Sequence, residues 1–256
     1  MDRFTLITGA SSGLGAEFAR IAARNKRNVI LTARSQEALE ALAEEVRQAH
    51  GIHAVTLPGD LGAAGEPARI WGAAAEGRQI DLLVNNAGLG ANGPFEDTDW
   101  AREQQSIDVN VTGLTALCKH AAPHMKAQRA GRILNVASTA AFVPGPNMAV
   151  YHATKAYVLS FSVALAEELT GTGVTVTTLC PGATQTGFFE AAEMTALKIV
   201  RSGGLPTAKS VAEFGYGAAI GGRLVAVPGT MNKASAMMGR LLPLRASARL
   251  VKRVMA

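Results

Sequence analysis

The chain has 256 residues, of which 48% are hydrophobic and 18% are charged. This composition is typical of a globular protein with one full-sized core, and it excludes disordered and collagen-like chains. Two cysteines, Cys118 and Cys180, are too few for a disulfide framework or a metal-ligand cluster, which favours a reducing compartment. The sequence begins without the features of a secretion signal and has no run of about 20 apolar residues, so we expect a soluble, cytoplasmic protein.

Positive charge is concentrated at the C-terminal end. The chain carries 25 Lys and Arg against 20 Asp and Glu, but seven basic residues and no acidic residue follow Glu213. Residues 1–213 therefore carry 18 basic and 20 acidic side chains, which argues against nucleic-acid binding by the body of the protein.

Seven short apolar runs alternate with longer helical stretches rich in Ala, Leu and Glu. The runs are Phe4–Thr8, Val29–Thr32, Ala54–Leu57, Leu82–Asn85, Ile133–Ala137, Val174–Leu179 and Leu224–Val227. Strands that are apolar almost throughout and are separated by helices predict a parallel sheet covered on both faces. The sequence thus predicts a single doubly wound α/β domain with a mainly parallel seven-stranded sheet, in which ligands bind beyond the carboxyl ends of the strands.

The first predicted strand leads into the glycine-rich segment TGASSGLG, residues 8–15, and then into a helical stretch. Glycines in such a turn let backbone N–H groups and the positive end of the helix approach a pyrophosphate. The spacing differs from GxGxxG, and by itself the segment could also be a tight turn of any α/β protein.

Polar side chains stand at the ends of later predicted strands. Asp60 follows the third, Asn85-Asn86-Ala87-Gly88 the fourth, Ser138 ends the fifth, and Tyr151-His152-Ala153-Thr154-Lys155 opens the next helix. Taken singly, each could be a helix cap, a turn former or a surface residue. Together and in this order they resemble the short-chain dehydrogenase/reductase family, whose core is a Rossmann fold, over at least residues 5–186.

The resemblance implies a catalytic group of four residues. Tyr151 and Lys155 are four apart on a helix and share a face, so we expect the ammonium to favour the phenolate by Coulomb attraction. Tyr151 would then exchange the proton, Lys155 would also hold the nicotinamide ribose, and Ser138 would bind the substrate oxygen. Asn110 would order a water that links Lys155 to solvent; without Tyr151 and Lys155, it would be explained as a polar residue that bends a long helix.

The resemblance also implies a nicotinamide dinucleotide and no metal. Arg34 follows the second strand, with no acid before Glu37, and an arginine here accommodates the 2′-phosphate of NADP, whereas an acid is typical of NAD enzymes. We therefore expect NADP(H); the alternative is a surface arginine that merely begins a helix. The expected cofactor contacts are Gly9, Ser11, Ser12, Gly13, Leu14, Gly15, Arg34, Asp60, Leu61, Asn86, Ala87, Gly88, Tyr151, Lys155, Pro181, Gly182, Thr184 and Thr186.

Apolar residues suggest the class of substrate. The segment Phe188–Pro206, which closes over the substrate in this family, contains Phe188, Phe189, Met194, Leu197, Ile199 and Val200, and Leu89, Phe142 and Val143 flank the catalytic loops. We expect a ketone, aldehyde or alcohol of moderate hydrophobicity, although these residues could equally be helix core. Two other functions stay open: a dinucleotide-sensing regulator without turnover, and an enoyl reductase or epimerase, which the four-residue spacing of Tyr151 and Lys155 disfavours.

Residues 232–256 are predicted to extend a catalytic domain of residues 1–231. Pro243 predicts two short helices here, each with an apolar and a basic side. The apolar residues include Met237, Met238, Leu241, Leu242, Leu244, Leu250, Val251 and Val254, and the cations are Arg240, Arg245, Arg249, Lys252 and Arg253. Packing on the domain or a sister subunit, binding to an anionic membrane and steering of an anionic substrate all fit this pattern. The family resemblance further implies a homo-oligomer, either dimer or tetramer.

Overall fold

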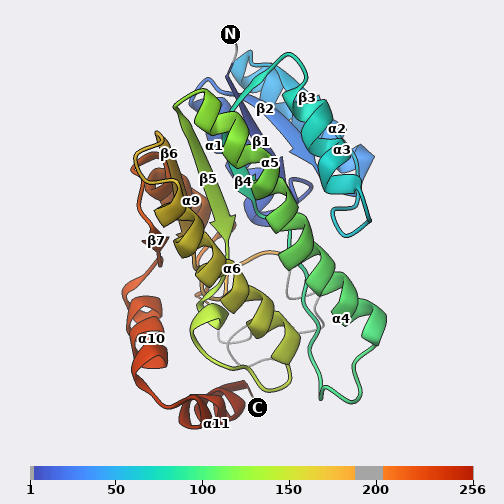
Figure 1. Cartoon of the computed structure of the whole chain (residues 1–256). Coiled ribbons are helices and arrows are strands. Elements are labelled where there is room, and N and C mark those ends of the chain that lie inside the picture. Colours follow the sequence, from blue (N-terminus) through green and yellow to red (C-terminus); the bar gives the residue numbers. More distant parts are fainter. Residues whose placement is uncertain (1–2, 188–203, 256) are drawn as a thin grey trace.

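A seven-stranded parallel sheet forms the centre of the computed structural model, which describes residues 3–187 and 204–255 (Figure 1). The strand order is β3-β2-β1-β4-β5-β6-β7, and each neighbouring pair is parallel. The strands are β1 (Arg3–Thr8), β2 (Asn28–Thr32), β3 (Ala54–Thr56), β4 (Gln79–Asn85), β5 (Gly131–Val136), β6 (Val174–Leu179) and β7 (Val225–Ala226). The predicted single-domain, doubly wound α/β fold is therefore confirmed.

Helices cover both faces of this sheet, and each face has its own apolar core. One face carries α1 (Gly13–Arg24), α2 (Gln36–His50) and α9 (Ala208–Ile220). The other carries α3 (Glu66–Ala75), α5 (Leu114–Ala127) and α6 (Ala149–Glu168). Neighbouring residues of a strand serve opposite faces: Leu6 belongs to the second core and Ile7 to the first. Because both faces are covered, the strands are apolar throughout.

The connection between β4 and β5 contains an irregular helix. After α4 (Trp100–Ile107), a π-helical turn, η1 (Asp108–Gly113), leads directly into α5. A short 3-10 helix, η2 (Thr139–Phe142), follows β5. Both irregular segments border the carboxyl edge of the sheet.

The direction of the chain across the sheet reverses at β1. From β1 the chain runs outward through β2 to β3, and then β4 pairs with the other side of β1. In an open α/β sheet the loops diverge at such a reversal, which leaves a crevice beyond the strand ends. The glycine-rich turn after β1 lies at this point.

Two helices follow β7 at the C-terminal end, α10 (Thr230–Leu241) and α11 (Leu244–Met255). They are separated at Leu242-Pro243, which confirms the predicted break, since proline cannot donate the backbone hydrogen bond that a continuous helix needs. Among the described residues, none of the helices is long and apolar enough to cross a membrane.

Candidate active site

The glycine-rich turn is tied to the end of β4 by a small hydrogen-bond network. The Thr8 hydroxyl accepts the backbone N–H groups of Asn86 and Ala87, both at 2.9 Å. In return, the Asn86 amide Nδ2 donates to the carbonyl oxygens of Thr8 at 2.9 Å and Gly9 at 3.2 Å. The side chain of Asn86 therefore holds the glycine-rich turn in place through these two hydrogen bonds. Thr8, which was not among the predicted contacts, completes this network, and its place as the last residue of β1 is the sequence signal for it.

The turn fits a dinucleotide because its glycines leave room for one. A Cβ atom on Gly15 would lie 2.1 Å from the carbonyl oxygen of Gly9, and Gly9 and Gly13 have φ angles of +63° and +54°. These positions therefore require glycine, and the backbone N–H groups before α1 stay uncovered by side chains. A helix that opens in this way is a ready anion site.

A cavity of about 1110 Å³ extends from this turn along the carboxyl edge of the sheet. It exceeds the roughly 300–1,000 Å³ of a typical pocket for one small ligand, so it has room for a dinucleotide and a substrate together. All the expected cofactor contacts line it except Gly15, which packs beneath the turn. Arg34 and Ser11 lie at one end, and Ser138 and Tyr151 lie at the other.

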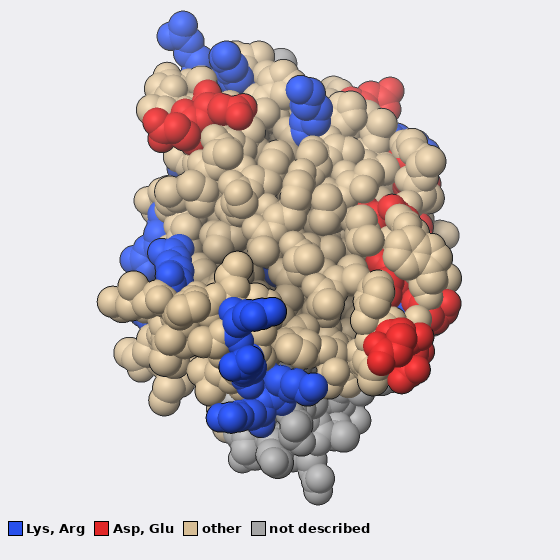
Figure 2. Space-filling model, turned by 60° about the horizontal axis from the view of Figure 1, so that its bottom comes forward, with Lys and Arg blue, Asp and Glu red and all other residues tan. Residues whose placement is uncertain are grey.

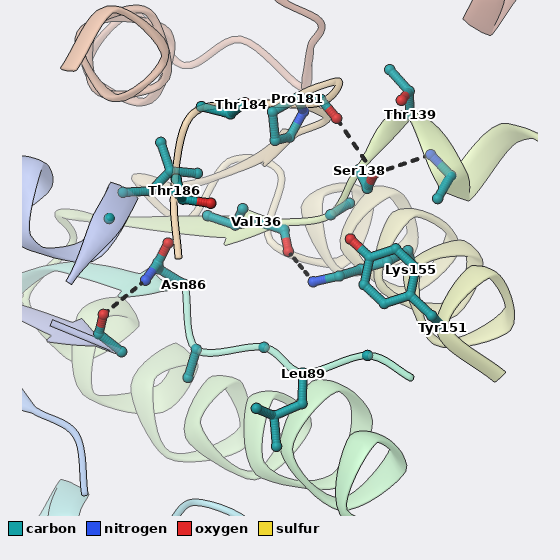
Figure 3. A pocket seen from close by; sticks show the side chains of 18 of the residues that line it. Asn86, Leu89, Val136, Ser138, Thr139, Tyr151, Lys155, Pro181, Thr184 and Thr186 are labelled. Atoms are coloured by element: carbon teal, nitrogen blue, oxygen red, sulfur yellow. Dashed lines mark hydrogen bonds between the residues drawn. The ribbon is translucent and has the colours of Figure 1, made fainter. Parts of the chain in front are cut away.

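Three of the predicted catalytic side chains converge in this cavity (Figure 3). The Tyr151 hydroxyl forms a hydrogen bond with Ser138, whose own hydroxyl also accepts the backbone N–H of Ala140 at 3.1 Å. Lys155 lies beneath the tyrosine, with Nζ 5.7 Å from the ring centre, and donates to the carbonyl oxygen of Val136 at 3.0 Å. The end of β5 and the first turns of α6 therefore bring the hydroxyls of Ser138 and Tyr151 and the ammonium of Lys155 together in the cavity.

The electrostatics differ from the sequence expectation. Burial raises the pKa of Tyr151 to about 12, against the opposing hydrogen bond with Ser138. Burial also lowers the pKa of Lys155 to about 8. We expected the ammonium to lower the pKa of Tyr151; with no dinucleotide bound, burial is the largest cause acting on this pKa and raises it. Cys180 beside Lys155 has its pKa raised to about 12 by burial, so it stays a neutral thiol and supplies no counter-ion.

Asn110 lies within the π-helical turn η1 and forms hydrogen bonds with the loop after β4. Its Oδ1 accepts the backbone N–H of Leu89 at 2.9 Å, and its Nδ2 donates to the Leu89 carbonyl at 2.8 Å and to Thr154 Oγ1 at 3.0 Å. The residue thus lies where the long helix departs from α geometry, as the structural alternative predicted. A Cβ on Gly88 would lie 3.2 Å from Lys155 Nζ and 3.3 Å from Asn110 Oδ1, so the asparagine also borders the lysine.

The loop after β6 closes the cavity above the catalytic group. The Pro181 carbonyl accepts the backbone N–H of Thr139 at 2.8 Å and the Ser138 hydroxyl at 3.4 Å, which joins this loop to the serine loop. Thr184 and Thr186 line the cavity as predicted, and a Cβ on Gly13 would meet the Thr186 side chain at 3.2 Å. Thr186 of this loop therefore lies directly beside Gly13 of the glycine-rich turn.

Asp60 and Leu61 line the cavity beyond β3, where they were expected. The Asp60 carboxylate also accepts the backbone N–H of Gly62 at 3.0 Å, so the residue is a turn former as well. Arg34 is exposed at the end of β2 and forms no ion pair within the described residues. Its guanidinium is thus free to meet an anion.

The two C-terminal helices form part of the cavity wall, and these contacts were not predicted individually. The wall residues are Ser235, Met238, Gly239, Leu242, Ser247, Leu250 and Val251. Leu89 and Val143 also line the cavity, whereas Phe142 is buried in the core beneath Arg240, whose guanidinium lies 5.0 Å from its ring centre. The apolar residues expected between Phe188 and Val200 lie outside the described residues.

Fold and site together define a dinucleotide-binding α/β protein with a serine, a tyrosine and a lysine convergent beside the cofactor cleft. The family model for short chain dehydrogenases matches residues 3–196. The chain therefore belongs to the short-chain dehydrogenase family of oxidoreductases.

Individual proteins show the same similarity. Ketoacyl reductase HetN from Nostoc sp. is 34% identical over 209 residues, which cover 81% of this chain and 71% of that protein. A short-chain dehydrogenase from Sphingobium yanoikuyae in complex with NADPH has a TM-score of 0.84 and 31% identity, and the match covers 93% of this chain and 92% of that one. A short chain dehydrogenase/reductase from Burkholderia phymatum in complex with NAD has a TM-score of 0.83 and 28% identity, with 92% of each chain covered.

Proposed function

We propose that the protein is an NADP(H)-dependent oxidoreductase that interconverts a ketone or aldehyde of moderate hydrophobicity and the corresponding alcohol. The observation that carries this proposal is the convergence of Ser138, Tyr151 and Lys155 in one cavity with the glycine-rich turn. A regulator that only senses a dinucleotide has no use for a buried ammonium beneath a tyrosine. The chemical arrangement therefore favours an enzyme over the regulatory alternative.

The preference for NADP(H) rests on Arg34. The guanidinium stands beside the cavity at the end of β2, and a planar fork of N–H donors binds a phosphate bidentately. Ser11 and Ser35 line the same end and offer hydroxyl donors. The similar proteins bind NADPH in one case and NAD in another, so they do not decide the choice for this chain.

The catalytic residues bind the carbonyl oxygen of the substrate and transfer a proton to it. When bound, the dinucleotide supplies or accepts the hydride. Ser138 and Tyr151 donate hydrogen bonds to the carbonyl oxygen, and the Tyr151 hydroxyl gives it a proton as negative charge develops. With a pKa of about 12, Tyr151 holds this proton at neutral pH, which suits carbonyl reduction. The Lys155 ammonium, with a pKa of about 8, stabilises the phenolate that the transfer leaves behind.

The substrate end of the cavity is largely apolar. Leu89, Val143, Met148 and Met238 line it together with Leu250. Such a wall favours an apolar substituent on the carbonyl carbon over a sugar or a charged small molecule. The similarity to a ketoacyl reductase supports a carbonyl attached to an aliphatic chain.

The test is consumption of reduced dinucleotide, followed by absorbance, with a panel of aliphatic and aromatic carbonyl compounds. We expect turnover with NADPH and at least tenfold weaker binding of NADH. Arg34→Ala should remove most of that preference, because a charge-assisted bidentate contact contributes about 1.5–3 kcal/mol. Arg24→Ala, on the exposed side of α1, is the matched control and should keep it. A preference that survives in Arg34→Ala would overturn the assignment of NADP(H), and dinucleotide binding without turnover on any carbonyl would favour the regulator.

We also propose a homo-oligomer in the cytoplasm. Tyr157 and Val163 on α6 are each 38% exposed, and a sister subunit would cover these side chains. Light scattering of the purified protein tests this, and a monomer at micromolar concentration would contradict it.

A further inference from the structure

The C-terminal helix α11 carries a basic face, which consists of Arg245, Arg249, Lys252 and Arg253. All four side chains are exposed, and none forms an ion pair within the described part of the chain. Figure 2 shows a group of lysine and arginine side chains near the lower edge of the view with no acidic side chain among them; acidic side chains lie along the right side and at the upper left. The basic face is therefore a patch of unneutralised positive charge.

The opposite side of α11 packs against the rest of the domain. At 3.6 residues per turn, the four cations fall on one side of the helix and Ser247 and Val251 on the other. Ser247 is only 1% exposed, and both residues line the cavity. Packing on the domain, one of the three uses predicted for this segment, thus occupies one side and leaves the basic face without a function.

Large apolar side chains project from the elbow between the two C-terminal helices. Met237 is 65% exposed, Leu241 74% and Leu244 70%. We call these three residues the apolar elbow. Single exposed leucines are common on the surfaces of soluble proteins. Three large apolar side chains that are close together in sequence and lie next to four unpaired cations instead indicate a contact surface.

We propose that α10 and α11 bind the surface of an anionic lipid bilayer, with the basic face on the headgroups and the apolar elbow inserted among them. Cations on one side of a helix and apolar residues beside them match the chemistry of an interfacial helix. An anionic carrier protein would use the cations but gives no role to two leucines that are 74% and 70% exposed. A second copy joined through the same face would bring like charges together. The bilayer is the occupant that satisfies both features.

The experiment is co-sedimentation of the full chain with vesicles of phosphatidylcholine alone or with about 30% phosphatidylglycerol. We expect binding to the anionic vesicles at 50 mM NaCl and release at 500 mM NaCl, because salt screens exposed charges over about 10 Å at 0.1 M. Each cation near an anionic surface strengthens binding by about fivefold, so the triple variant Arg249→Gln, Lys252→Gln, Arg253→Gln should bind about a hundredfold more weakly.

Two further variants separate the contributions. Lys119→Gln, Lys126→Gln, Lys209→Gln removes the same charge from exposed sites elsewhere and should bind like the wild type. Leu241→Ser with Leu244→Ser should weaken binding at least about tenfold without changing turnover, since neither residue lines the cavity. No sedimentation of the wild type at low salt, or an equal loss in both triple variants, would overturn the proposal. So would a shift from dimer to monomer in the leucine variant with vesicle binding intact, which would assign the apolar elbow to a sister subunit. None of these outcomes depends on whether the proposed reaction is correct.

The division between a catalytic domain of residues 1–231 and a C-terminal extension of residues 232–256 stays a prediction. The helix α10 begins at Thr230, just after β7.

Discussion

Replacement of Lys155 by methionine should make the protein more stable and catalytically inactive. Lys155 is 4% exposed, and no carboxylate lies within ion-pair distance of its ammonium in the part of the chain described. The fall of its pKa from 10.5 to about 8 means that folding disfavours the charged form by about 3 kcal/mol. Methionine removes this penalty but also the hydrogen bond to the Val136 carbonyl, which contributes about 1 kcal/mol. The net gain is about 1–2 kcal/mol, or a rise in Tm of about 3–6 °C for a chain of this length.

The pH dependence of this gain gives a sharper test than its size. The Lys155 pKa is lower in the folded state than in the unfolded state, so the penalty is complete below pH 8 and disappears as pH rises from about 8 to 10.5. Urea unfolding of Lys155→Met and wild type should therefore differ most at pH 7 and converge near pH 10. The exposed Lys119→Met should show no such trend. A methionine variant less stable than wild type at pH 7, or a difference that does not shrink with pH, would refute the reasoning.

Two further predictions concern the turn and the proton. Gly15→Ala places a methyl group against the Gly9 carbonyl oxygen, so dinucleotide affinity should fall at least about tenfold and stability by about 1–3 kcal/mol, measured by titration and thermal unfolding. Gly72→Ala, in a helix with open space around it, should instead leave binding intact and stabilise by about 0.4–1 kcal/mol; equal losses in both variants would contradict this account of the turn. Alcohol oxidation requires the Tyr151 phenolate, whose fraction rises about tenfold per pH unit below a pKa of about 12, so oxidation should accelerate from pH 6 to 8, the range in which Lys155, with a pKa of about 8, still carries its charge. Carbonyl reduction requires the phenol and should not accelerate, and a parallel rise of both rates would exclude this role.

Strand positions were predictable because a sheet buried on both faces leaves apolar runs in the sequence. The prediction began β4 at Leu82, whereas the strand begins at Gln79. The three residues that the prediction missed include Asp81. Its side chain is buried, with 5% exposed, and forms an ion pair with Arg27, which lies just before β2. A buried charge satisfied by a distant partner carries no apolar signal, so the sequence pattern stopped short of it.

The candidate site was predictable to the extent that parallel strands bring their carboxyl ends together. The residues at the ends of β1, β3, β4 and β5 needed only the strand order to meet in one cavity. The contribution of α10 and α11 to the cavity wall depends on how the chain returns after β7, which no local pattern encodes. The direction of the Tyr151 pKa also depends on depth of burial, and spacing along a helix cannot show how far two groups are removed from water.

The proton on Tyr151 is the central claim, and Tyr151→Phe tests it most directly. The measurement is single-turnover reduction of a carbonyl compound by bound NADPH, with dinucleotide affinity determined on the same samples. Phenylalanine keeps the ring over Lys155 and removes only the hydroxyl, so the affinity should stay within about threefold of wild type while the turnover rate falls by about 10²–10⁴. A rate within tenfold of wild type, at unchanged NADPH affinity, would contradict the account.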